Sequence, residues 1–452
     1  MSESAAEEKA RLFARARAAL DALRAGESTS PTPDAYWVPG RIEFLGKHTD
    51  YAGGHSLLCT VERGICLLAI ARPDRRLRIV DAARPADIVD TAIDADSEST
   101  AGHWSTYPAA VARRIALNFG EPLVGADIAF VSDLPLASGL SSSSALVVAT
   151  FLALSRINDL ANRREYSRNI HTAEDLAGYL GAVENGRDFG ELAAAAGVGT
   201  FGGSEDHTAI LCSTRDSLVD YGFCPVRFQA RFPLPPDHEF VIASSGIVAE
   251  KIGAARDAYN RASLAVVRAL ELWNRTTGRS DATLAVALDS SRGAIGEMRR
   301  IIADEVNDDP ALVSAGGLSR DDARWLMARV RQFHLETELI PQAGFALSDG
   351  ALLQLGAVVD RSQLAAERDL GNQIPVTIWL ARDARLNGAT AASAFGAGFG
   401  GSVYALVRSE IAEAFCAGWS ERYREMFPDA GASAMFFRTR AGPPAVRVTL
   451  TD

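Results

Sequence analysis

The stretch PGRIEFLGKHTDYAGGHSL, residues 39–57, raises the first question about the fold, because it places Gly46 and Lys47 among further glycines. A phosphate-binding P-loop needs Gly, four residues and then Gly-Lys-Ser/Thr, because its backbone N–H groups wrap a phosphate of fixed size. Here five residues separate Gly40 from Gly46, and His48 stands where a P-loop has Ser or Thr. The spacing and the missing hydroxyl exclude a P-loop, so the stretch needs another explanation.

Length and composition indicate the class of protein. A chain of 452 residues is too long for one ordinary core, so we expect two domains. A composition of 48% hydrophobic and 23% charged residues is typical of a globular protein in water. The net charge of −11 disfavours a nucleic-acid surface, although local basic residues and helix N-termini can still bind small anions.

The cysteines and the N-terminus indicate the cellular setting. The five cysteines are widely spaced without a CxxC or Cys/His cluster, which predicts neither a disulfide framework nor a structural zinc site. The N-terminal sequence MSESAAEEKARLFARARAALDAL lacks the apolar region of a signal peptide. No run of about eighteen apolar residues occurs, so we expect no transmembrane helix. These features favour a cytoplasmic enzyme.

Hydrophobic periodicity predicts the elements of the N-terminal half. Residues 5–25 have the spacing of an amphipathic helix, which the polar sequence STSPTPD ends. The runs IEFLG and SLLCTVERGICLLAIA suit buried strands. Residues 104–117 are predicted to be a helix, and residues 126–136 a strand that leads into a serine-rich segment.

The C-terminal half is predicted to begin after a cluster of prolines. VRFQARFPLPP, residues 226–236, is the best candidate for an inter-domain link, and residues 239–246 are the next predicted strand. Helical patterns run from about 247 to 275 and from 283 to 337. Residues 390–407 predict a glycine loop followed by a buried strand.

Two glycine- and serine-rich segments are candidate phosphate sites. SGLSSSSAL, residues 138–146, places hydroxyls at the start of a predicted helix, where unpaired N–H groups and the helix dipole favour phosphate. A serine-capped helix after a turn is the alternative interpretation. FGAGFGGS, residues 395–402, concentrates glycine before a strand, and taken alone it predicts a tight turn.

Two other segments bring polar side chains together. The opening stretch carries Arg41, His48, Asp50 and Tyr51, which would be costly to bury together without a polar ligand. GVGTFGGSEDHTAIL, residues 197–211, sets acidic residues after a double glycine, which predicts either an acidic N-cap or a carboxylate at the mouth of a phosphate site.

In this order the segments resemble the motifs of the GHMP kinases, the superfamily of galactokinase, homoserine kinase and mevalonate kinase. PGRIEFLGKHTDYAGG is similar to the galactokinase signature PGRVNLIGEHTDYNGG, and SGLSSSSAL and GAGFGGS match the second and third motifs. HWSTYPAAVAR resembles a galactokinase segment whose Trp lies against adenine. The resemblance implies a two-domain α+β fold, with an N-terminal α/β domain over residues 1–228 and a C-terminal ferredoxin-like domain over residues 229–452.

The resemblance also implies a role for individual residues. Asp206 would abstract or hold the proton of the sugar hydroxyl, and Arg41 would orient Asp206 and offset charge on the transferred phosphoryl group. The implied sugar-binding residues are Lys47, His48, Asp50, Gly203 and Tyr259. The implied ATP-binding residues are Trp104, Ser138, Gly139, Leu140, Ser141, Ser142, Ser143 and Ser144. Ser143 and Glu184 would hold Mg²⁺.

Two positions depart from the galactokinase signature. Lys47 replaces a Glu that in galactokinases bonds the C6 hydroxyl of galactose, and Glu43 replaces an Asn. A cation in the pocket would favour an anionic or acceptor group at that end of the sugar. Alternatively, a salt bridge with Glu43 absorbs Lys47, and the sugar is neutral.

The expected activity is therefore that of an ATP-dependent kinase acting on the anomeric C1 hydroxyl of galactose or a related sugar, with ATP and Mg²⁺ as cofactors. The expected protein is a monomer or weak homo-oligomer that needs neither nucleic acid nor membrane. A catalytically silent regulator that binds sugar and ATP is the alternative, which the presence of Arg41 and Asp206 disfavours. A mevalonate- or homoserine-type kinase is disfavoured because HTDYAGG is typical of the sugar branch.

Overall fold

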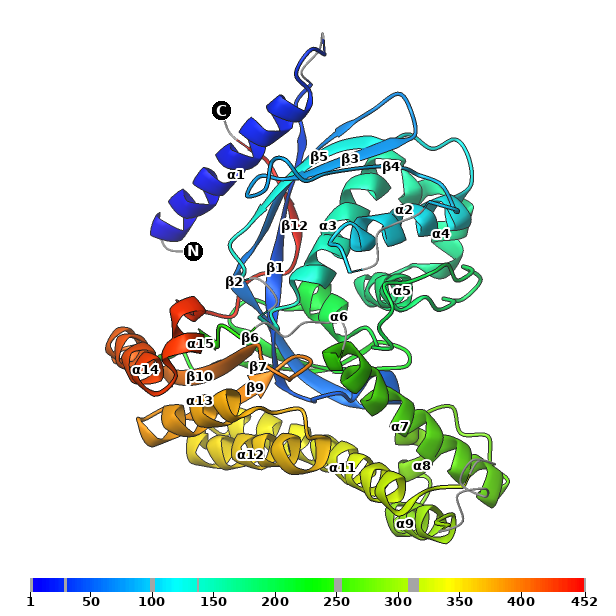
Figure 1. The fold of residues 1–452 in the computed structure, drawn as a ribbon, viewed down its shortest axis with the longest axis vertical. Helices are drawn as coiled ribbons and strands as arrows, with labels where there is room; N and C mark the ends of the chain where they lie inside the picture. Colours follow the sequence, from blue (N-terminus) through cyan, green and yellow to red (C-terminus); the bar gives the residue numbers. More distant parts are fainter. Residues whose placement is uncertain are drawn as a thin grey trace.

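The computed structural model describes residues 3–27, 31–97, 102–135, 138–247, 254–307 and 317–450. Its strands form two sheets, which confirms the expected α+β fold (Figure 1). The strands of the first sheet are β1 Asp34–Leu45, β2 His55–Ala71, β3 Arg76–Asp81, β4 Ile88–Ala92, β5 Ala126–Ser132, β6 Ser217–Gly222, β7 Arg227–Pro233 and β12 Val446–Val448. Those of the second are β8 His238–Ser244, β9 Ala391–Phe395, β10 Ser402–Arg408 and β11 Met435–Thr439.

The helices precede, separate and follow these strands. In the N-terminal half they are α1 Glu3–Leu23, α2 Thr106–Phe119, α3 Ser142–Ile157, α4 Arg164–Asn169, α5 Ala173–Asn185 and α6 Glu205–Cys212. In the C-terminal half they are α7 Ala254–Thr277, α8 Leu284–Asp289, α9 Ala294–Asp304, α11 Arg320–Ser348, α12 Leu352–Ala365, α13 Pro375–Leu386, α14 Ala412–Met426 and α15 Pro428–Ser433. Among the described residues, no helix is long and apolar enough to cross a bilayer.

Strand β2 organises the first sheet, whose order is β12-β1-β2-β5-β3-β4. Its first residues pair with β6 and its last residues pair with β5, while β1 runs antiparallel along its other edge. Gly64 lies where β1 crosses closely, and a Cβ at this position would collide with the carbonyl oxygen of Val38. The glycine therefore lets two long, apolar strands stay paired through an irregular register.

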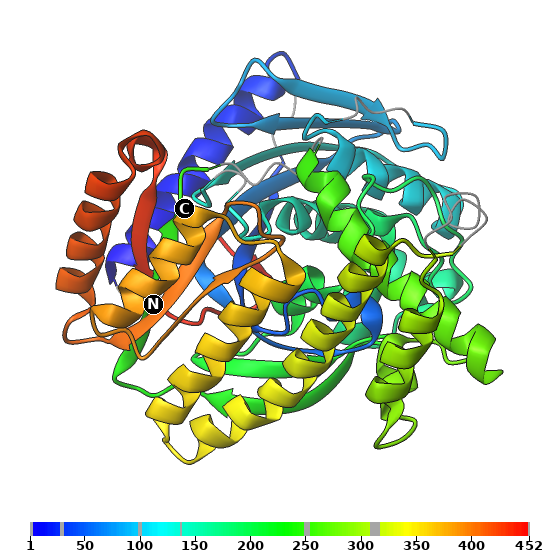
Figure 2. The same cartoon turned by 60° about the horizontal axis from the view of Figure 1, so that its bottom comes forward.

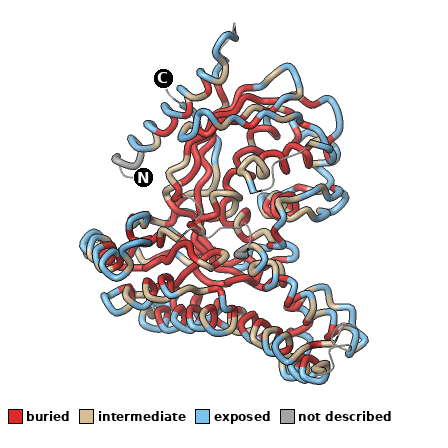
Figure 3. Tube along the Cα trace, in the orientation of Figure 1, coloured by how far each residue is buried: buried red, intermediate tan, exposed pale blue. Residues whose placement is uncertain are grey.

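Both faces of the first sheet are covered, because side chains along a strand alternate between its faces. On β2, Ile65 and Leu67 point into the core formed with α2, α3 and α5. The intervening Cys66 and Leu68 point to the opposite side, where α1 packs. Figure 1 shows α1 on one side of this sheet and α2 to α5 on the other. In Figure 3 the strands are mostly buried, whereas the outer turns of the helices are exposed.

The second sheet, in the order β11-β8-β10-β9, is antiparallel throughout and is also covered on both faces. Val241 of β8 packs against α13 and α14. The neighbouring Phe240 and Ile242 point the other way, into a core that includes α11, α12 and residues of β1 and β2. Figure 2 shows α11 and α12 side by side. The two halves of the molecule therefore meet through a shared apolar core.

The predicted inter-domain link is wrong in its local structure. Residues 227–233 form β7, which pairs with β6 in the first sheet, because their apolar residues suit a strand and the prolines lie at its ends. The domain boundary predicted at 228/229 falls inside this strand, and β12 returns to pair with β1. We propose that the boundary lies after Pro233 and that β12 belongs to the first domain.

The long helical patterns of the C-terminal half are also corrected. The pattern over 283–337 divides into α8, α9 and α11, and α11 continues to Ser348. The pattern over 247–275 corresponds to α7, which begins at Ala254, and residues 248–253 lie outside the described part of the chain. The helices predicted at 5–25 and 104–117 and the strands around 42–71 and 239–246 are confirmed within a few residues. The strand predicted over 126–136 ends at Ser132, and residue 136 lies outside the described part of the chain. Within 390–407 the strand predicted after the glycine loop is β10, whereas β9, which precedes the loop, was not predicted.

Candidate active site

A cavity of about 1140 Å³ brings the predicted motifs together. Its lining combines β1 and the turn that follows it, the start of α3, the end of α5, the loop before α6, and Arg256 and Tyr259 of α7. The predicted site residues that line it are Arg41, His48, Asp50, Trp104, Gly139, Ser141, Ser142, Ser143, Ser144, Glu184, Gly203, Asp206 and Tyr259. Lys47, Ser138 and Leu140 are not among the lining residues.

An ion pair between Arg41 and Asp206 lies at the centre of the lining. The Nε and second terminal nitrogen of Arg41 donate to Asp206 Oδ1 at 2.8 and 2.7 Å. Arg41 also donates to the carbonyl oxygen of Gly139, which connects β1 to the serine-rich segment. Burial alone would lower the pKa of Arg41, but the nearby carboxylates of Asp206, Glu205 and Glu43 outweigh it and raise this pKa. Arg41 is therefore a fixed cation that orients Asp206.

The opening stretch forms a polar turn at the end of β1. Gly46 and His48 have positive φ values of 103° and 58°, which turn the chain so that His48 and Asp50 face the cavity. Asp50 accepts backbone N–H bonds from Tyr51 at 2.9 Å and Glu205 at 3.1 Å. Burial, with the charge of Arg329, lowers the pKa of His48 to about 3, so His48 is a neutral hydrogen-bonding group at physiological pH.

The serine-rich segment enters helix α3, as predicted. Ser141 adopts a left-handed conformation with φ 58°, and its side chain makes no capping bond to the helix. The Oγ atom of Ser141 is buried without a hydrogen-bond partner among the residues that the structure describes. An orphaned hydroxyl and a helix N-terminus in one cavity wall suit the oxygens of a phosphate.

The third glycine motif, residues 395–402, packs against the serine-rich segment. Ser402 Oγ donates to the carbonyl oxygen of Ser138 at 2.6 Å. A Cβ on Gly396 would lie 2.9 Å from the carbonyl oxygen of Gly139, so the two loops can pack this closely only with glycine. Ser138 and Leu140 belong to this packing, because Ser138 bonds Pro135 and Leu140 is buried in the apolar core.

The serine in contact with Glu184 is Ser144, the residue after the predicted Ser143. Ser144 Oγ lies 2.9 Å from Glu184 Oε2 and 3.2 Å from Asp206 Oδ2. Adjacent helix residues point about 100° apart, so Ser143 and Ser144 meet different neighbours although both line the cavity. These donors are all oxygens, which fits Mg²⁺. No group of three His, Cys, Asp or Glu able to hold a metal occurs in the described ranges.

Lys47 points away from the cavity. Its side chain is fully buried, and its Nζ donates to Ser362 Oγ at 2.9 Å. Ser362 donates in turn to Glu336 Oε1 at 2.6 Å, and Glu336 Oε2 accepts from the backbone N–H of Gly46 at 3.0 Å. Burial raises the pKa of Glu43 to about 7, and the charge of Lys47 offsets part of this rise, although no direct ion pair joins these two described residues. The ammonium therefore lies inside the interface with α11 and α12.

The double glycine before α6 allows close contacts at one end of the cavity. A Cβ on Gly202 would lie 2.6 Å from the hydroxyl oxygen of Tyr259, and one on Gly203 would collide with Asp50. Asn185 holds this loop, because its side chain accepts from Gly202 N at 2.7 Å and donates to Gly203 O at 2.9 Å. The loop thus brings α5, α6 and α7 to the same wall.

Trp104 lines the opposite end of the cavity. Its indole Nε1 donates to Asp87 Oδ2 at 2.6 Å, and its ring packs edge-on against Phe130 with centroids 5.6 Å apart. The bond and the packing fix the plane of the indole, which leaves an aromatic surface in the lining.

Sequence analysis missed several residues around the cavity as members of the site. Glu205 and Glu43 are buried beside Arg41, and Asn185 holds the glycine loop. Arg329, from α11, donates to the carbonyl oxygen of His48 and to Tyr51. Glu205 and Asn185 are adjacent to predicted residues in the sequence, which is a usable signal. Arg329 carries no such signal, because only the packing of α11 brings it to the turn.

Two family models match this chain. The model described as GHMP kinases N terminal domain matches residues 106–188, and the Galactokinase galactose-binding signature matches residues 27–71. The first range contains α2, the serine-rich segment and α5, and the second contains β1 and the polar turn. Both matches therefore fall on walls of the cavity.

Whole-chain comparisons agree with these matches. The galactokinase of Roseiflexus sp. (strain RS-1) is 27% identical over 91% of this chain and 92% of its own length. That of Streptomyces coelicolor is 25% identical over 88% and 94%. The crystal structure of Lactococcus lactis galactokinase complexed with galactose is similar in fold, with a TM-score of 0.71 at 21% identity over 95% of this chain and 98% of that chain.

The chain therefore carries the GHMP kinase N-terminal domain and the galactokinase galactose-binding signature. It is similar to galactokinases over most of its length, and it is a galactokinase-like, ATP-dependent sugar kinase.

Proposed function

We propose that this kinase transfers the γ-phosphoryl group of ATP to the anomeric C1 hydroxyl of galactose or a closely related sugar. The observation that carries the proposal is the ion pair in which two nitrogens of Arg41 contact Asp206 Oδ1, set between the serine-rich start of α3 and the polar turn. This arrangement places a fixed acid–cation pair between a phosphate-binding element and a group of hydroxyl-binding side chains.

The roles follow from these positions. Asp206 accepts or holds the proton of the sugar hydroxyl, and Arg41 keeps its carboxylate oriented while offsetting negative charge on the phosphoryl group. His48, Asp50, Gly203 and Tyr259 bind the sugar, and Gly139 with Ser141 to Ser144 binds the phosphates. The indole of Trp104 faces the adenine.

The oxygen donors Ser143, Ser144 and Glu184 fit Mg²⁺, and they would hold it together with the phosphate oxygens of ATP. Bound there, the cation would neutralise charge on the phosphates. The serine hydroxyls and Glu184 keep their orientation through the Ser144–Glu184 bond and the buried His207, whose Nε2 lies 3.1 Å from Glu184.

The position of Lys47 bears on which sugar is used. Because its ammonium contacts Ser362 inside the domain interface, Lys47 presents no charge to the cavity. This geometry supports a neutral, galactose-like sugar over one with an anionic group at C6.

The test is ADP release over a panel of sugars that includes galactose, galacturonate and pentoses, with ³¹P NMR to locate the new phosphate. We expect turnover of galactose or a neutral relative, a phosphate on C1, and loss of turnover in Asp206→Asn. Tight binding of sugar and ATP without ADP release from any sugar would instead support the silent regulator.

A further inference from the structure

Two buried carboxyl groups lie directly behind Arg41 and have no assigned role. Glu43 comes from β1 and Glu205 from the first turn of α6, and only 3% and 5% of their surfaces are exposed. Glu43 Oε2 accepts from the backbone N–H of Gly396 at 3.2 Å, and Glu205 Oε2 accepts from Ser56 Oγ at 2.8 Å. The remaining oxygen of Glu43, Oε1, is buried with no donor among the described residues.

The two carboxyl groups line the same cavity, both act on Arg41, and they interact with each other. Two carboxylates this close in a buried site cannot both be charged at low cost, and the usual solution is one proton shared between them. A shared proton also gives the orphaned Glu43 Oε1 the donor that its surroundings lack. The closeness of the two carboxyl groups and the missing hydrogen-bond donor at Glu43 Oε1 therefore both indicate a shared proton.

We propose that Glu43 and Glu205 are positioning residues that share one proton and thereby hold Arg41 on Asp206. This inference rests on the proposed phosphoryl transfer for its effect on catalysis, but the proton sharing itself does not. Arg41 Nε is 4.0 Å from Glu205 Oε1, whereas its bonds to Asp206 are 2.8 and 2.7 Å long. With the proton in place, the pair carries one negative charge, and Asp206 is the preferred partner of Arg41.

Loss of the proton would change this balance. The pair would then carry two negative charges, which compete for Arg41 and oppose the negative charge of the phosphates. The charged groups facing Glu43 are Lys47, Arg41, Glu205 and Glu336, and those facing Glu205 are Glu43, Asp50, Arg41 and Asp206. Burial raises the pKa of Glu43 to about 7 and raises that of Glu205 well above its usual range, so the proton is lost near or above neutral pH.

The decisive variant is Glu43→Gln, because the glutamine amide donates to Glu205 at every pH. We expect kcat of the wild type to fall as pH rises above about 7, and we expect this fall to move upward by about one pH unit or more in Glu43→Gln. Glu43→Leu, which offers no donor, should lower kcat about tenfold to a hundredfold at every pH, with little change in KM for ATP. Glu205→Gln serves as the second variant if Glu43→Gln folds poorly.

Asp133→Asn is the matched control. Asp133 follows β5, its Oδ1 accepts from Gly64 N at 2.6 Å, and burial raises its pKa to about 6, but it does not line the cavity. Its substitution should change how the stability of the fold depends on pH and leave the pH profile of kcat unchanged. If Glu43→Gln keeps the alkaline fall of the wild type, or if Asp133→Asn shifts it equally, the positioning role is overturned.

A measurement without substrates separates this inference from the proposed function. In the ligand-free protein, the unfolding midpoint of Glu43→Gln relative to wild type should rise as pH increases from about 4.5 to about 7, because over this range the unfolded wild type releases a proton that its folded state retains. A difference that does not vary with pH would overturn proton sharing even in an active kinase. A pH-dependent difference in a protein with no sugar kinase activity would support proton sharing and refute only the proposed function.

Discussion

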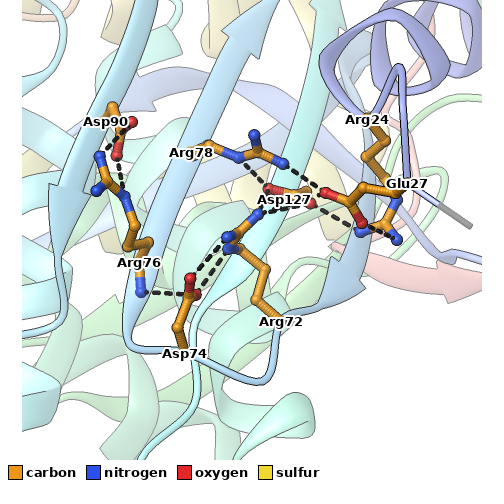
Figure 4. Close-up of polar contacts among 8 residues, drawn as sticks. All are labelled: Arg24, Glu27, Arg72, Asp74, Arg76, Arg78, Asp90 and Asp127. Atoms are coloured by element: carbon orange, nitrogen blue, oxygen red, sulfur yellow. Dashed lines mark hydrogen bonds and ion pairs between the residues drawn. The ribbon is translucent and has the colours of Figure 1, made fainter.

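Two buried clusters of charged residues lie against the first sheet, and they differ in how completely their carboxylates are paired. Beside α1, the fully buried Asp127 of β5 meets three guanidinium groups, from Arg24 at 2.7 Å, Arg72 at 3.1 Å and Arg78 at 2.6 Å (Figure 4). Glu27 and Asp74 bond the outer sides of the same arginines. In the cavity, Arg41 faces three carboxyl groups, those of Asp206, Glu205 and Glu43.

The pKa shifts of the two clusters have opposite signs. Burial alone would raise the pKa of Asp127, but the ion pairs with Arg78 and Arg72 outweigh it and lower this pKa. Burial raises the pKa of Glu43, and Lys47 and Arg41 offset this only in part. The Asp127 cluster is therefore complete without any ligand, and it fixes the end of α1 to the sheet. The cavity cluster carries excess acid, which is the arrangement expected of a site that handles protons and charged substrates.

The largest effect should follow from breaking the complete cluster. Asp127→Asn removes the fully buried carboxylate that three partly buried arginines share, so we expect a loss of about 3–5 kcal/mol in the free energy of unfolding. Chemical denaturation measures this loss, and kcat at low temperature should stay near that of the wild type. A stable Asp127→Asn protein would mean that Glu27 and Asp74 suffice to pair the arginines.

The second effect concerns the cavity cluster, and it should fall on kcat and not on the free energy of unfolding. Asp206→Asn should lower kcat about a hundredfold or more, because a positioned base contributes on that scale. Stability and ATP affinity should change little, which calorimetric unfolding and nucleotide titration would measure. Turnover near the wild-type value would remove Asp206 from the mechanism and make Glu205 the next candidate.

The third effect is the pH dependence of stability. Glu43 has a raised pKa in the fold, so the fold is most stable below the ordinary value of 4.5 and loses stability as pH rises to about 7. Glu43→Gln should therefore gain about 1–3 kcal/mol at pH 8 and almost nothing at pH 4. Asp127 has a lowered pKa, so its contribution is present above its unfolded value and is lost as pH falls. Denaturation curves should therefore show the gain of Glu43→Gln growing between about pH 4.5 and 7, and the loss of Asp127→Asn shrinking only as pH falls below the ordinary aspartate value of 3.8.

The smallest effect is expected at Lys47. Lys47→Glu would remove the donor to Ser362 and place a carboxylate near Glu336, so some loss of stability should follow. The ratio of kcat/KM for galactose to that for galacturonate should nevertheless stay unchanged, because the side chain does not line the cavity. A marked shift of this ratio toward galactose would show that Lys47 contacts the sugar after all.

The sequence by itself indicated the resemblance to galactokinases, the α+β fold and the motifs that meet at the cavity. The motifs around Arg41, Ser141 and Asp206 could be recognised because each is a short run of consecutive residues. Local signals also predicted where helix α3 begins. A glycine before a serine run, or a proline at the end of a strand, acts through backbone geometry within a few residues, so it can be recognised without knowing the fold.

The tertiary structure alone decided which side chains meet. It put Ser144 against Glu184, turned Lys47 toward Ser362 on α12, brought Glu43 and Glu205 beside Arg41, and returned β12 to the first sheet. Each of these contacts joins segments that are far apart in the chain and depends on helix rotation and strand register. If helix α3 were rotated by one residue, Ser143 instead of Ser144 would face Glu184, and no local sequence pattern predicts which of the two serines makes the contact.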